Sequence, residues 1–299
     1  MRRMLIATTL VGADQAVIDK VGSAVATSLA ALLGPLVRTD ALGPCALDFV
    51  VEADTVSSVH RIAREAIGEA SVDLCVQSAL HRRKRLLIAD MDSTIIGCEC
   101  LDELADFAGV KAAVSAITER AMRGEIGFEG ALRERVAMLK GLPLAALQQC
   151  YDERVRLNPG ARTLVRTMAA HGARCLLVSG GFEFFTRRVA AAAGFHADRA
   201  NRLIEADGVL TGAVAEPILG REAKLAALNA EVGALGIDPA DTLAVGDGAN
   251  DLAMIGAAGL GVAYRAKPLV AAEADARVDH ADLTALLYFQ GYRADQFSS

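Results

Sequence analysis

Two aspartates stand two residues apart directly after a short apolar run. Asp90 and Asp92 follow residues 86–89, Leu-Leu-Ile-Ala. A run of this kind indicates a short buried strand, so both carboxyl groups fall at its carboxyl end. In open α/β sheets the ligand crevice lies outside that end of the strands. One carboxylate can then act as a nucleophile while the other carries a proton, which suits phosphoryl transfer.

Two further apolar runs end in groups that suit the same chemistry. Ser179, Gly180 and Gly181 end one of them, where a hydroxyl and backbone N–H groups can bind phosphate oxygens. Asp247 ends the other. Lys224 precedes that run at the start of a helix, and its compact ammonium group suits a phosphate oxygen.

A phosphate dianion repels a carboxylate nucleophile, so the chemistry also needs a hard cation. Mg²⁺ prefers one or two carboxylates together with water and substrate oxygens. We expect Asp90 and Asp247 to be ligands, with a backbone carbonyl near Asp92 completing the protein's share. Each motif alone is common in turns, caps and solvated helices. Their joint occurrence at the ends of apolar runs indicates one catalytic site.

The elements that position these groups alternate between strand and helix from residue 86 onward. This alternation predicts a doubly wound, mostly parallel, Rossmann-like α/β sheet. The expected strands are residues 86–90, 174–179, 242–247 and 260–263. Between the first two strands, helical patterns occur at 101–107, 111–122, 128–139 and 144–151. We expect this insertion, about residues 98–165, to cover the site as a helical cap.

Residues 1–80 follow a different pattern, that of a small α+β unit. The expected strands are residues 5–11, 36–39, 46–52 and 72–77, and the expected helices are 17–29 and 56–67. The order βαββαβ predicts a ferredoxin-like arrangement, and alternating residues in 72–77 predict a half-buried strand. The unit carries no catalytic cluster and resembles ACT-type regulatory domains in its element order. A homodimer through this unit is expected, and a unit that only dimerises or stabilises the chain remains the alternative.

Composition narrows the function classes. The net charge is −6, which argues against a general nucleic-acid binder. We expect the basic run 81–85 to be a solvated linker, with a polyanion-binding patch as the alternative. The six cysteines form no Cys-x-x-Cys pair, which favours reduced thiols and a cytoplasmic protein. Residues 2–11 resemble a short signal peptide, but a strand is the better interpretation, and no membrane span is expected.

The cap must select the substrate, because this chemistry fits almost any phosphate ester. Glu99 can pair with an ammonium group. Phe128 and Arg135 share one helix face, and Arg135 offers a bidentate fork to a carboxylate. Met122 and Phe128 can exclude water from the site. Alternatively, Glu99 caps the first cap helix, Arg135 forms surface ion pairs, and Met122 and Phe128 are ordinary core residues.

The four motifs resemble those of the haloacid dehalogenase superfamily, and more closely its phosphoserine phosphatase family, over residues 86 to about 290. Residues 200–203 and 208–212 also resemble that family. The resemblance implies that Asp90 is the nucleophile and Asp92 the proton donor. It implies that Mg²⁺ binds Asp90, the backbone carbonyl of Asp92, and Asp247. Asn250 would contact the substrate phosphate, and Asp251 would help organise the metal site.

The same resemblance assigns substrate roles to the residues at Glu99, Met122, Phe128 and Arg135. Residues 81–299 would then form a phosphatase domain that hydrolyses O-phospho-L-serine through an aspartyl-phosphate, the last step of serine biosynthesis. Two alternatives remain open. A phosphotransferase would pass the phosphoryl group to another alcohol, and a sensor protein would combine an amino-acid-binding front domain with an inactive back domain.

Overall fold

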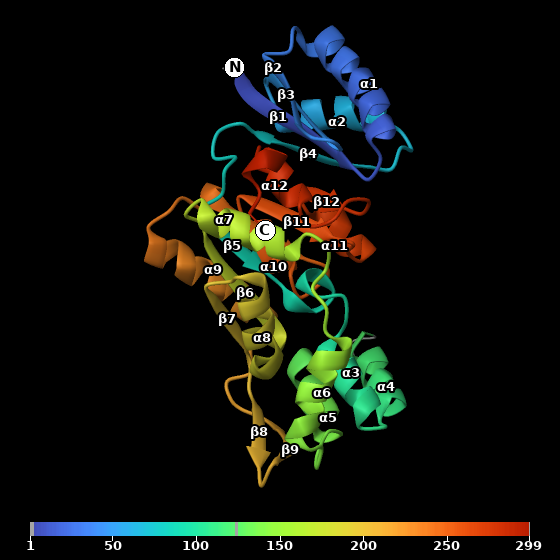
Figure 1. Cartoon of the computed structure of the whole chain (residues 1–299), viewed down its shortest axis with the longest axis vertical. Helices are drawn as coiled ribbons and strands as arrows, with labels where there is room; N and C mark the ends of the chain where they lie inside the picture. The colour runs from blue at the N-terminus through green and yellow to red at the C-terminus, as the bar shows by residue number, and fades with distance from the viewer. Residues whose placement is uncertain (1–2, 123–124, 299) are drawn as a thin grey trace.

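Two sheets organise the chain in the computed structural model, which describes residues 3–122 and 125–298. A four-stranded antiparallel sheet lies at one end of an elongated molecule, and a six-stranded parallel sheet lies in the middle (Figure 1). A helical cap and a two-stranded hairpin lie at the other end (Figure 1). The expected fold class is therefore confirmed.

The N-terminal unit has the predicted order βαββαβ. Its elements are β1 (Met4–Gly12), α1 (Gln15–Leu33), β2 (Arg38–Gly43), β3 (Ala46–Ala53), α2 (Val56–Ile67) and β4 (Val72–Ser78). The strands lie in the order β2-β3-β1-β4. The expected strand at 36–39 is displaced toward the C-terminus, because a tight hairpin sets the register of β2 by placing Gly43 opposite Ala46.

Helix α1 is long and apolar enough to cross a membrane by length and composition. The expectation that no apolar segment approaches a span was therefore wrong on that criterion. Its buried residues, Ile18, Val21, Val25 and Leu29, belong to the core of the N-terminal unit. A core helix that packs one face onto a sheet meets the same criterion, so the length of α1 is weak evidence for a membrane.

Strand β4 is buried on both faces, whereas the sequence predicted a half-buried strand. The side chains expected to face water instead contact the unit that contains the parallel sheet and the predicted catalytic residues (residues 86–298, called the catalytic unit below). Both carboxylate oxygens of Asp73 accept hydrogen bonds from the backbone N–H groups of residues 279–281, at 2.8–3.3 Å. The Gln77 amide donates to the Phe289 carbonyl at 2.8 Å. The alternating polar residues of β4 therefore face the second unit and form the interface with it, not a surface exposed to water.

The basic run 81–85 is only in part the solvated linker that its composition predicted, because His81, Arg83 and Arg85 are exposed but the two residues between them are buried. Arg82 and Lys84 are 8% and 5% exposed. Arg82 forms a bidentate pair with the fully buried Asp48 at 2.5 and 2.9 Å and also donates to Thr9. The Lys84 ammonium donates to two backbone carbonyls of the catalytic unit. A buried charge needs such partners, and here they fasten the linker to both units.

The central sheet has strands in the order β12-β11-β10-β5-β6-β7, and all its neighbouring pairs are parallel. Its strands are β5 (Leu86–Ala89), β6 (Arg174–Phe182), β7 (Ala197–Asn201), β10 (Thr242–Gly246), β11 (Leu260–Tyr264) and β12 (Ala276–Val278). The sequence did not predict β7 and β12. The first, Ala-Asp-Arg-Ala-Asn, lacks an apolar run, and the second has three residues.

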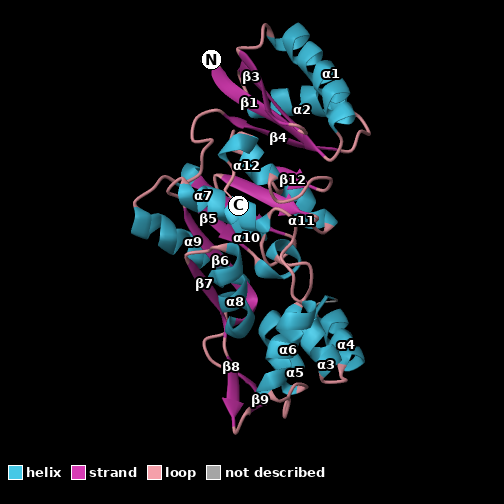
Figure 2. Cartoon of the chain, viewed as in Figure 1, coloured by secondary structure: helices cyan, strands magenta, loops and turns pink. Residues whose placement is uncertain are grey.

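Helices flank the central sheet on both faces, as Figure 2 shows. They are α7 (Ala161–Ala170), α8 (Glu183–Ala193), α9 (Arg221–Leu235), α10 (Leu252–Ala257), α11 (Pro268–Glu273) and α12 (Ala285–Phe289). Alternate strand residues enter two cores. Leu87 and Leu177 pack with α7 and α8, whereas Leu86 and Ile88 pack with α9 and α10. Near-continuous apolar strands are typical of a parallel sheet covered on both faces.

Strand β5 comes first along the chain, yet it lies in the middle of the sheet. Strands β6 and β7 extend the sheet on one side of it, and β10, β11 and β12 on the other. The strand order therefore reverses between β5 and β10, where a crevice forms at the carboxyl ends of an open α/β sheet. Asp90 follows β5 and Asp247 follows β10, so both acids flank this point.

The cap contains four helices, close to the predicted positions: α3 (Cys100–Phe107), α4 (Lys111–Met122), α5 (Phe128–Ala137) and α6 (Leu144–Arg154). A hairpin, β8 (Leu203–Ala206) and β9 (Val209–Val214), joins the cap through backbone bonds between Leu210 and residues 141–142. The hairpin was not predicted. Its turn residues Asp207 and Gly208 both have positive φ, so the Asp-Gly pair was the available signal.

We expect Arg82→Met to lower the free energy of unfolding by about 3–5 kcal/mol, because it removes the close bidentate cation from the buried Asp48 and leaves only the longer contact with the exposed Arg38, at 3.4 Å. Urea unfolding at pH 7 measures this change. The matched control is Arg61→Met, which breaks an exposed ion pair with Glu65 at 3.2 Å and should cost about 0.5 kcal/mol or less. Equal effects of the two substitutions would show that the Arg82 pair does not hold the units together.

Candidate active site

A cavity of about 480 Å³ lies between the carboxyl ends of the strands and the cap. Nine of the residues expected at the site line it: Asp90, Asp92, Glu99, Phe128, Arg135, Ser179, Gly180, Asp247 and Asn250. Lys224 and Asp251 lie beneath it as buried groups, 2% and 0% exposed. The side chain of Met122 lies outside the described residues, so its expected place in the wall stays a prediction.

Asp90 is held in place by the sheet itself. Its backbone N–H donates to the Val245 carbonyl at 3.0 Å, which continues the pairing of β5 with β10. Its carboxylate accepts the Met91 N–H at 2.8 Å and lies 2.7 Å from the Lys224 ammonium. Burial and the neighbouring Asp251 charge raise the pKa of Asp90, whereas Lys224 lowers it. Further positive charge beside Asp90 would therefore favour its ionised carboxylate.

Asp92 sits on a tight turn that brings its carboxylate back over the strand ends. The turn passes through Ser93 at φ 55°, a left-handed conformation that a non-glycine residue adopts at a cost. One Asp92 oxygen accepts the Cys100 N–H at 2.9 Å, and the other accepts the Ser179 hydroxyl at 3.1 Å. Burial raises the pKa of Asp92, and these hydrogen bonds oppose the rise. A raised pKa suits a group that gives and takes a proton.

Lys224 joins the two sides of the strand-order reversal. Its ammonium lies 2.7 Å from Asp90 and 2.6 Å from Asp251. Burial alone would lower the pKa of Lys224, but the charges of Asp90 and Asp251 raise it above its ordinary value. The second Asp251 oxygen accepts the N–H groups of Asp247 and Gly248, at 3.2 and 3.1 Å. Asp251 thus fixes both Lys224 and the loop that carries Asp247.

Three carboxylates can converge on one cation. Asp90, Asp247 and Asp251 each offer an oxygen atom within 4.8 Å of the others. Carboxylate oxygens are the hard donors that divalent cations such as Mg²⁺ prefer. Burial, and then the Asp251 charge, raise the pKa of Asp247, so positive charge at this cluster would favour the ionised form of Asp247. The donor set therefore fits a divalent cation.

The cap places Glu99 and Arg135 at the same cavity. The Ser93 hydroxyl donates to Glu99 at 2.6 Å, and Glu99 makes no side-chain cap bond to α3, contrary to the alternative reading. Burial and then the Asp92 charge raise the pKa of Glu99 to about 7. Arg135 donates from Nε to the Ala131 carbonyl at 3.2 Å, and burial lowers its pKa.

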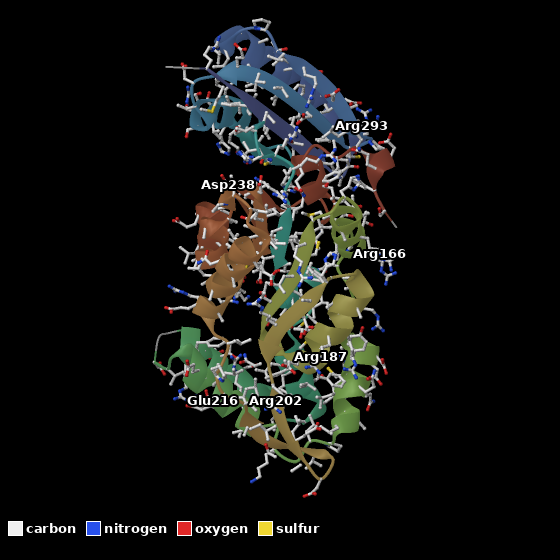
Figure 3. All side chains as sticks on the ribbon, turned by 90° about the vertical axis from the view of Figure 1, so that its left-hand side faces the viewer. Arg166, Arg187, Arg202, Glu216, Asp238 and Arg293 are labelled. Atoms are coloured by element: carbon white, nitrogen blue, oxygen red, sulfur yellow. The ribbon has the colours of Figure 1, made fainter. Side chains whose placement is uncertain are left out.

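Surface ion pairs involve the neighbouring Arg133. It pairs with Glu129 at 3.4 Å and with Glu216, which lies at the end of the molecule that carries the cap (Figure 3). The alternative of surface ion pairs therefore applies to Arg133.

The ring of Phe128 lies beside the Ser179 loop. Phe128 is 39% exposed, and a methyl group added at Gly180 would lie 3.2 Å from its ring. The ring therefore faces the cavity and is not ordinary core.

Sequence reasoning missed several residues at the site. Asp102 and Thr118 line the cavity from the cap, and Lys267 lines it from the loop after β11. The predicted strand at 260–263 held the signal for Lys267, because its carboxyl end faces the same crevice. Asn201 is buried and bonds the carbonyls of Gly180 and Leu219, at 2.8 and 3.2 Å. It joins the Ser179 loop to the segment that leads into α9.

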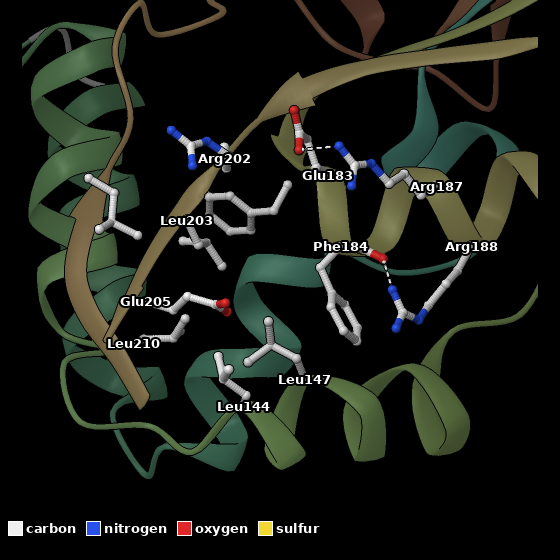
Figure 4. A pocket seen from close by; sticks show the side chains of 12 residues that line it. Leu144, Leu147, Glu183, Phe184, Arg187, Arg188, Arg202, Leu203, Glu205 and Leu210 are labelled. Atoms are coloured by element: carbon white, nitrogen blue, oxygen red, sulfur yellow. Dashed lines mark hydrogen bonds and ion pairs between the residues drawn. The ribbon is translucent and has the colours of Figure 1, made fainter. Parts of the chain in front are cut away.

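A second hollow, of about 350 Å³, lies between α6, α8 and the hairpin (Figure 4). Two of the basic residues in its wall have partners beside them. Arg187 pairs with Glu183 at 2.7 Å, and Arg188 donates to the Phe184 carbonyl at 2.9 Å (Figure 4). Leu144 and Leu147 supply an apolar side. Neither the strand-end aspartates nor Lys224 lines this hollow.

Comparison with known proteins agrees with this geometry. Residues 87–256 match the model of the haloacid dehalogenase-like hydrolase family. A phosphoserine phosphatase of Polaromonas sp. is 49% identical over 208 residues, which cover 68% of this chain and 88% of that protein. A haloacid dehalogenase family hydrolase of Salmonella enterica serovar Typhi superposes with a TM-score of 0.84 at 30% identity, over 95% of this chain and 98% of that one.

A solved phospho-aspartyl intermediate analogue of phosphoserine phosphatase is also similar. It is 38% identical, has a TM-score of 0.64, and is matched over 69% of this chain and 99% of its own. The sequence relative and this structure each match about two thirds of this chain, and the Salmonella hydrolase extends the likeness through most of it. This chain therefore belongs to the haloacid dehalogenase-like hydrolases and, within them, to the phosphoserine phosphatase family.

Proposed function

We propose that this protein hydrolyses O-phospho-L-serine to L-serine and inorganic phosphate through an aspartyl-phosphate on Asp90. The observation that carries the proposal is the single cavity lined by Asp90 and Asp92 at the strand ends and by Glu99 and Arg135 at the cap. The strand-end aspartates then face the phosphate of this ester, the Glu99 carboxylate faces its ammonium group, and the Arg135 guanidinium faces its carboxylate. The names of the similar proteins support the same substrate.

Asp90 acts as the nucleophile. Its carboxylate attacks phosphorus, and the bond between phosphorus and the serine oxygen breaks. Asp92 gives its proton to the departing alkoxide. It then removes a proton from the water that attacks the aspartyl-phosphate, which releases inorganic phosphate and restores Asp90. The burial of Asp92 supports this double role, because it raises the pKa of the acid.

Asp90, Asp247 and the backbone carbonyl of Asp92 would hold the metal, with Asp251 supporting the site. Bound Mg²⁺ would supply positive charge that offsets the repulsion between Asp90 and the phosphate. The chain's own residues bind the remaining phosphate oxygens: the Ser179 hydroxyl, the Gly180 backbone, Asn250 and, beneath them, Lys224. The proposal of magnesium rests on the hard oxygen donors of the cluster.

The cap recognises the serine part of the ester. Glu99 accepts the ammonium group, and Arg135 binds the carboxylate with two parallel hydrogen bonds. Phe128, and Met122 at the end of α4, exclude water. Water exclusion strengthens each of these charge interactions, because the local dielectric constant falls.

For the rest of the chain we propose residues 1–80 as a regulatory or dimerising domain and residues 81–299 as the phosphatase domain, with its cap at about 98–165. A homodimer through the N-terminal domain and a cytoplasmic location complete the proposal. The location rests on the six cysteines, all free thiols, which are typical of a reducing compartment.

Purified protein with Mg²⁺ should hydrolyse phosphoserine in clear preference to sugar phosphates and nucleotides in a phosphate-release assay. Asp90→Asn should abolish turnover, because the amide is a poor nucleophile. Unchanged phosphatase activity in that variant would refute the assignment of Asp90. Homoserine added as acceptor separates the rival reaction, since a phosphotransferase would form homoserine phosphate.

The KM for phosphoserine should rise as the pH falls below about 7, because Glu99 becomes protonated and no longer attracts the ammonium group. Glu99→Gln should raise this KM about tenfold at pH 8 and flatten the pH dependence. Phosphoglycolate is the matched ester, since it titrates at the phosphate but lacks the amine. A similar pH response with both esters would show that Glu99 does not bind the ammonium group.

Gly181→Ala should lower kcat by roughly tenfold to a hundredfold, because a misplaced catalytic group is costly. The new methyl group would lie 3.0 Å from an Asp92 oxygen and from the Ser179 hydroxyl. Gly130→Ala is the control, as its methyl group meets nothing within 4 Å and replaces a helical glycine. Steady-state kinetics of both variants test the effect. Equal kcat values would show that the Ser179 loop does not position Asp92.

A further inference from the structure

We propose that Lys267 is a second phosphate-binding cation of the active site, whose ammonium contacts the phosphoryl oxygens of the substrate and then the inorganic phosphate product. The inference rests on the proposed phosphatase function but not on the identity of the alcohol. It assigns a binding role to a residue outside the four sequence motifs.

The first argument is that Lys224 is already engaged. Its ammonium has three N–H donors, and two of them are directed at Asp90 and Asp251, at 2.7 and 2.6 Å. The side chain is 2% exposed and lies beneath the cavity. Lys224 therefore mainly compensates buried carboxylates, and at most one donor remains for a phosphate oxygen.

The second argument is the charge balance of the cavity wall. Among the described residues that line the cavity, five are acidic: Asp90, Asp92, Glu99, Asp102 and Asp247. Two are basic, Arg135 and Lys267. Arg135 belongs to the cap, where Glu99 and Asp102 oppose the loss of its charge. Lys267 is thus the basic residue that the wall offers at the strand-end side, where a dianion must bind.

The third argument is that the backbone of Lys267 is anchored beside the cluster of carboxylates formed by Asp90, Asp247 and Asp251. Its N–H donates to the Asp247 carbonyl at 3.1 Å, and its own carbonyl accepts the N–H groups of Val270 and Ala271 in the first turn of α11. Pro268 follows at the first helical position, where its fixed φ suits the helix start. The loop that carries Lys267 therefore keeps a fixed distance from Asp247.

The side chain itself is available to a ligand. It is exposed, and no hydrogen bond or ion pair engages its ammonium in the described part of the chain. The lysine side chain is flexible, so its ammonium can keep a charge-assisted hydrogen bond to the phosphate while the ester is converted to the product.

Calorimetric titration of the full-length, Mg²⁺-loaded protein with inorganic phosphate tests this role, at low and at high KCl. We expect Lys267→Met to weaken phosphate binding about tenfold and to raise the KM for phosphoserine to a similar extent. The salt dependence of binding should also decrease, because the lost contact is exposed and therefore screened. Lys267→Arg should restore most of the affinity.

All variants keep the Lys267 N–H bond to Asp247, so a purely structural role of this loop would leave phosphate affinity unchanged. The matched control is Lys20→Met on α1, which removes the same charge from the N-terminal unit and should leave phosphate binding unaltered. Wild-type affinity and salt dependence in Lys267→Met, with an unchanged thermal midpoint, would overturn the inference. Wild-type protein that binds no phosphate would overturn the claim that Lys267 holds the product, whereas wild-type protein that hydrolyses no phosphate ester would overturn the phosphatase proposal on which the inference rests.

Discussion

The buried charge cluster of Asp90, Lys224 and Asp251 is the constraint on which the rest of the catalytic unit depends. One ammonium lies within 2.7 Å of two carboxylates, and all three groups are almost fully buried. Such charges are tolerable only when each has its partners, so the strands that carry them must meet. The reversal of strand order between β5 and β10 brings them together. The fold and the charge cluster therefore specify each other.

The cluster also explains why the site calls for a cation. Asp247 adds a third carboxylate within 4.8 Å, whereas Lys224 provides a single positive charge. Burial, and then the neighbouring Asp251 charge, raise the pKa of Asp90 and of Asp247, which opposes the ionised state of both carboxyl groups. A divalent cation bound by these oxygen atoms would favour the ionised carboxylates and so remove this conflict.

Sequence patterns predicted most helices and strands with a clear apolar pattern. They did not predict which polar residues are buried at the contact between the two units. Asp90 and Asp247 were predictable because each ends a short apolar strand. The burial of Arg82 was not, since its partner Asp48 lies in another unit and composition alone describes a solvated run. The β8–β9 hairpin was missed although Asp207-Gly208 marks its turn. Sequence patterns thus identified residues that line one cavity, whereas the contacts between the units depend on packing.

The docking of the N-terminal unit limits how it can influence the enzyme or a second copy. One face of its sheet packs against α1 and α2, and the other meets α12, where Gln77 and Arg82 both donate to the Phe289 carbonyl. Strand β4 lies against β12. The remaining open edge is β2, because the other edge and both faces are covered. Contact between two copies through this unit would therefore use β2 or the outer sides of its helices, and would leave the interface with the phosphatase unit intact.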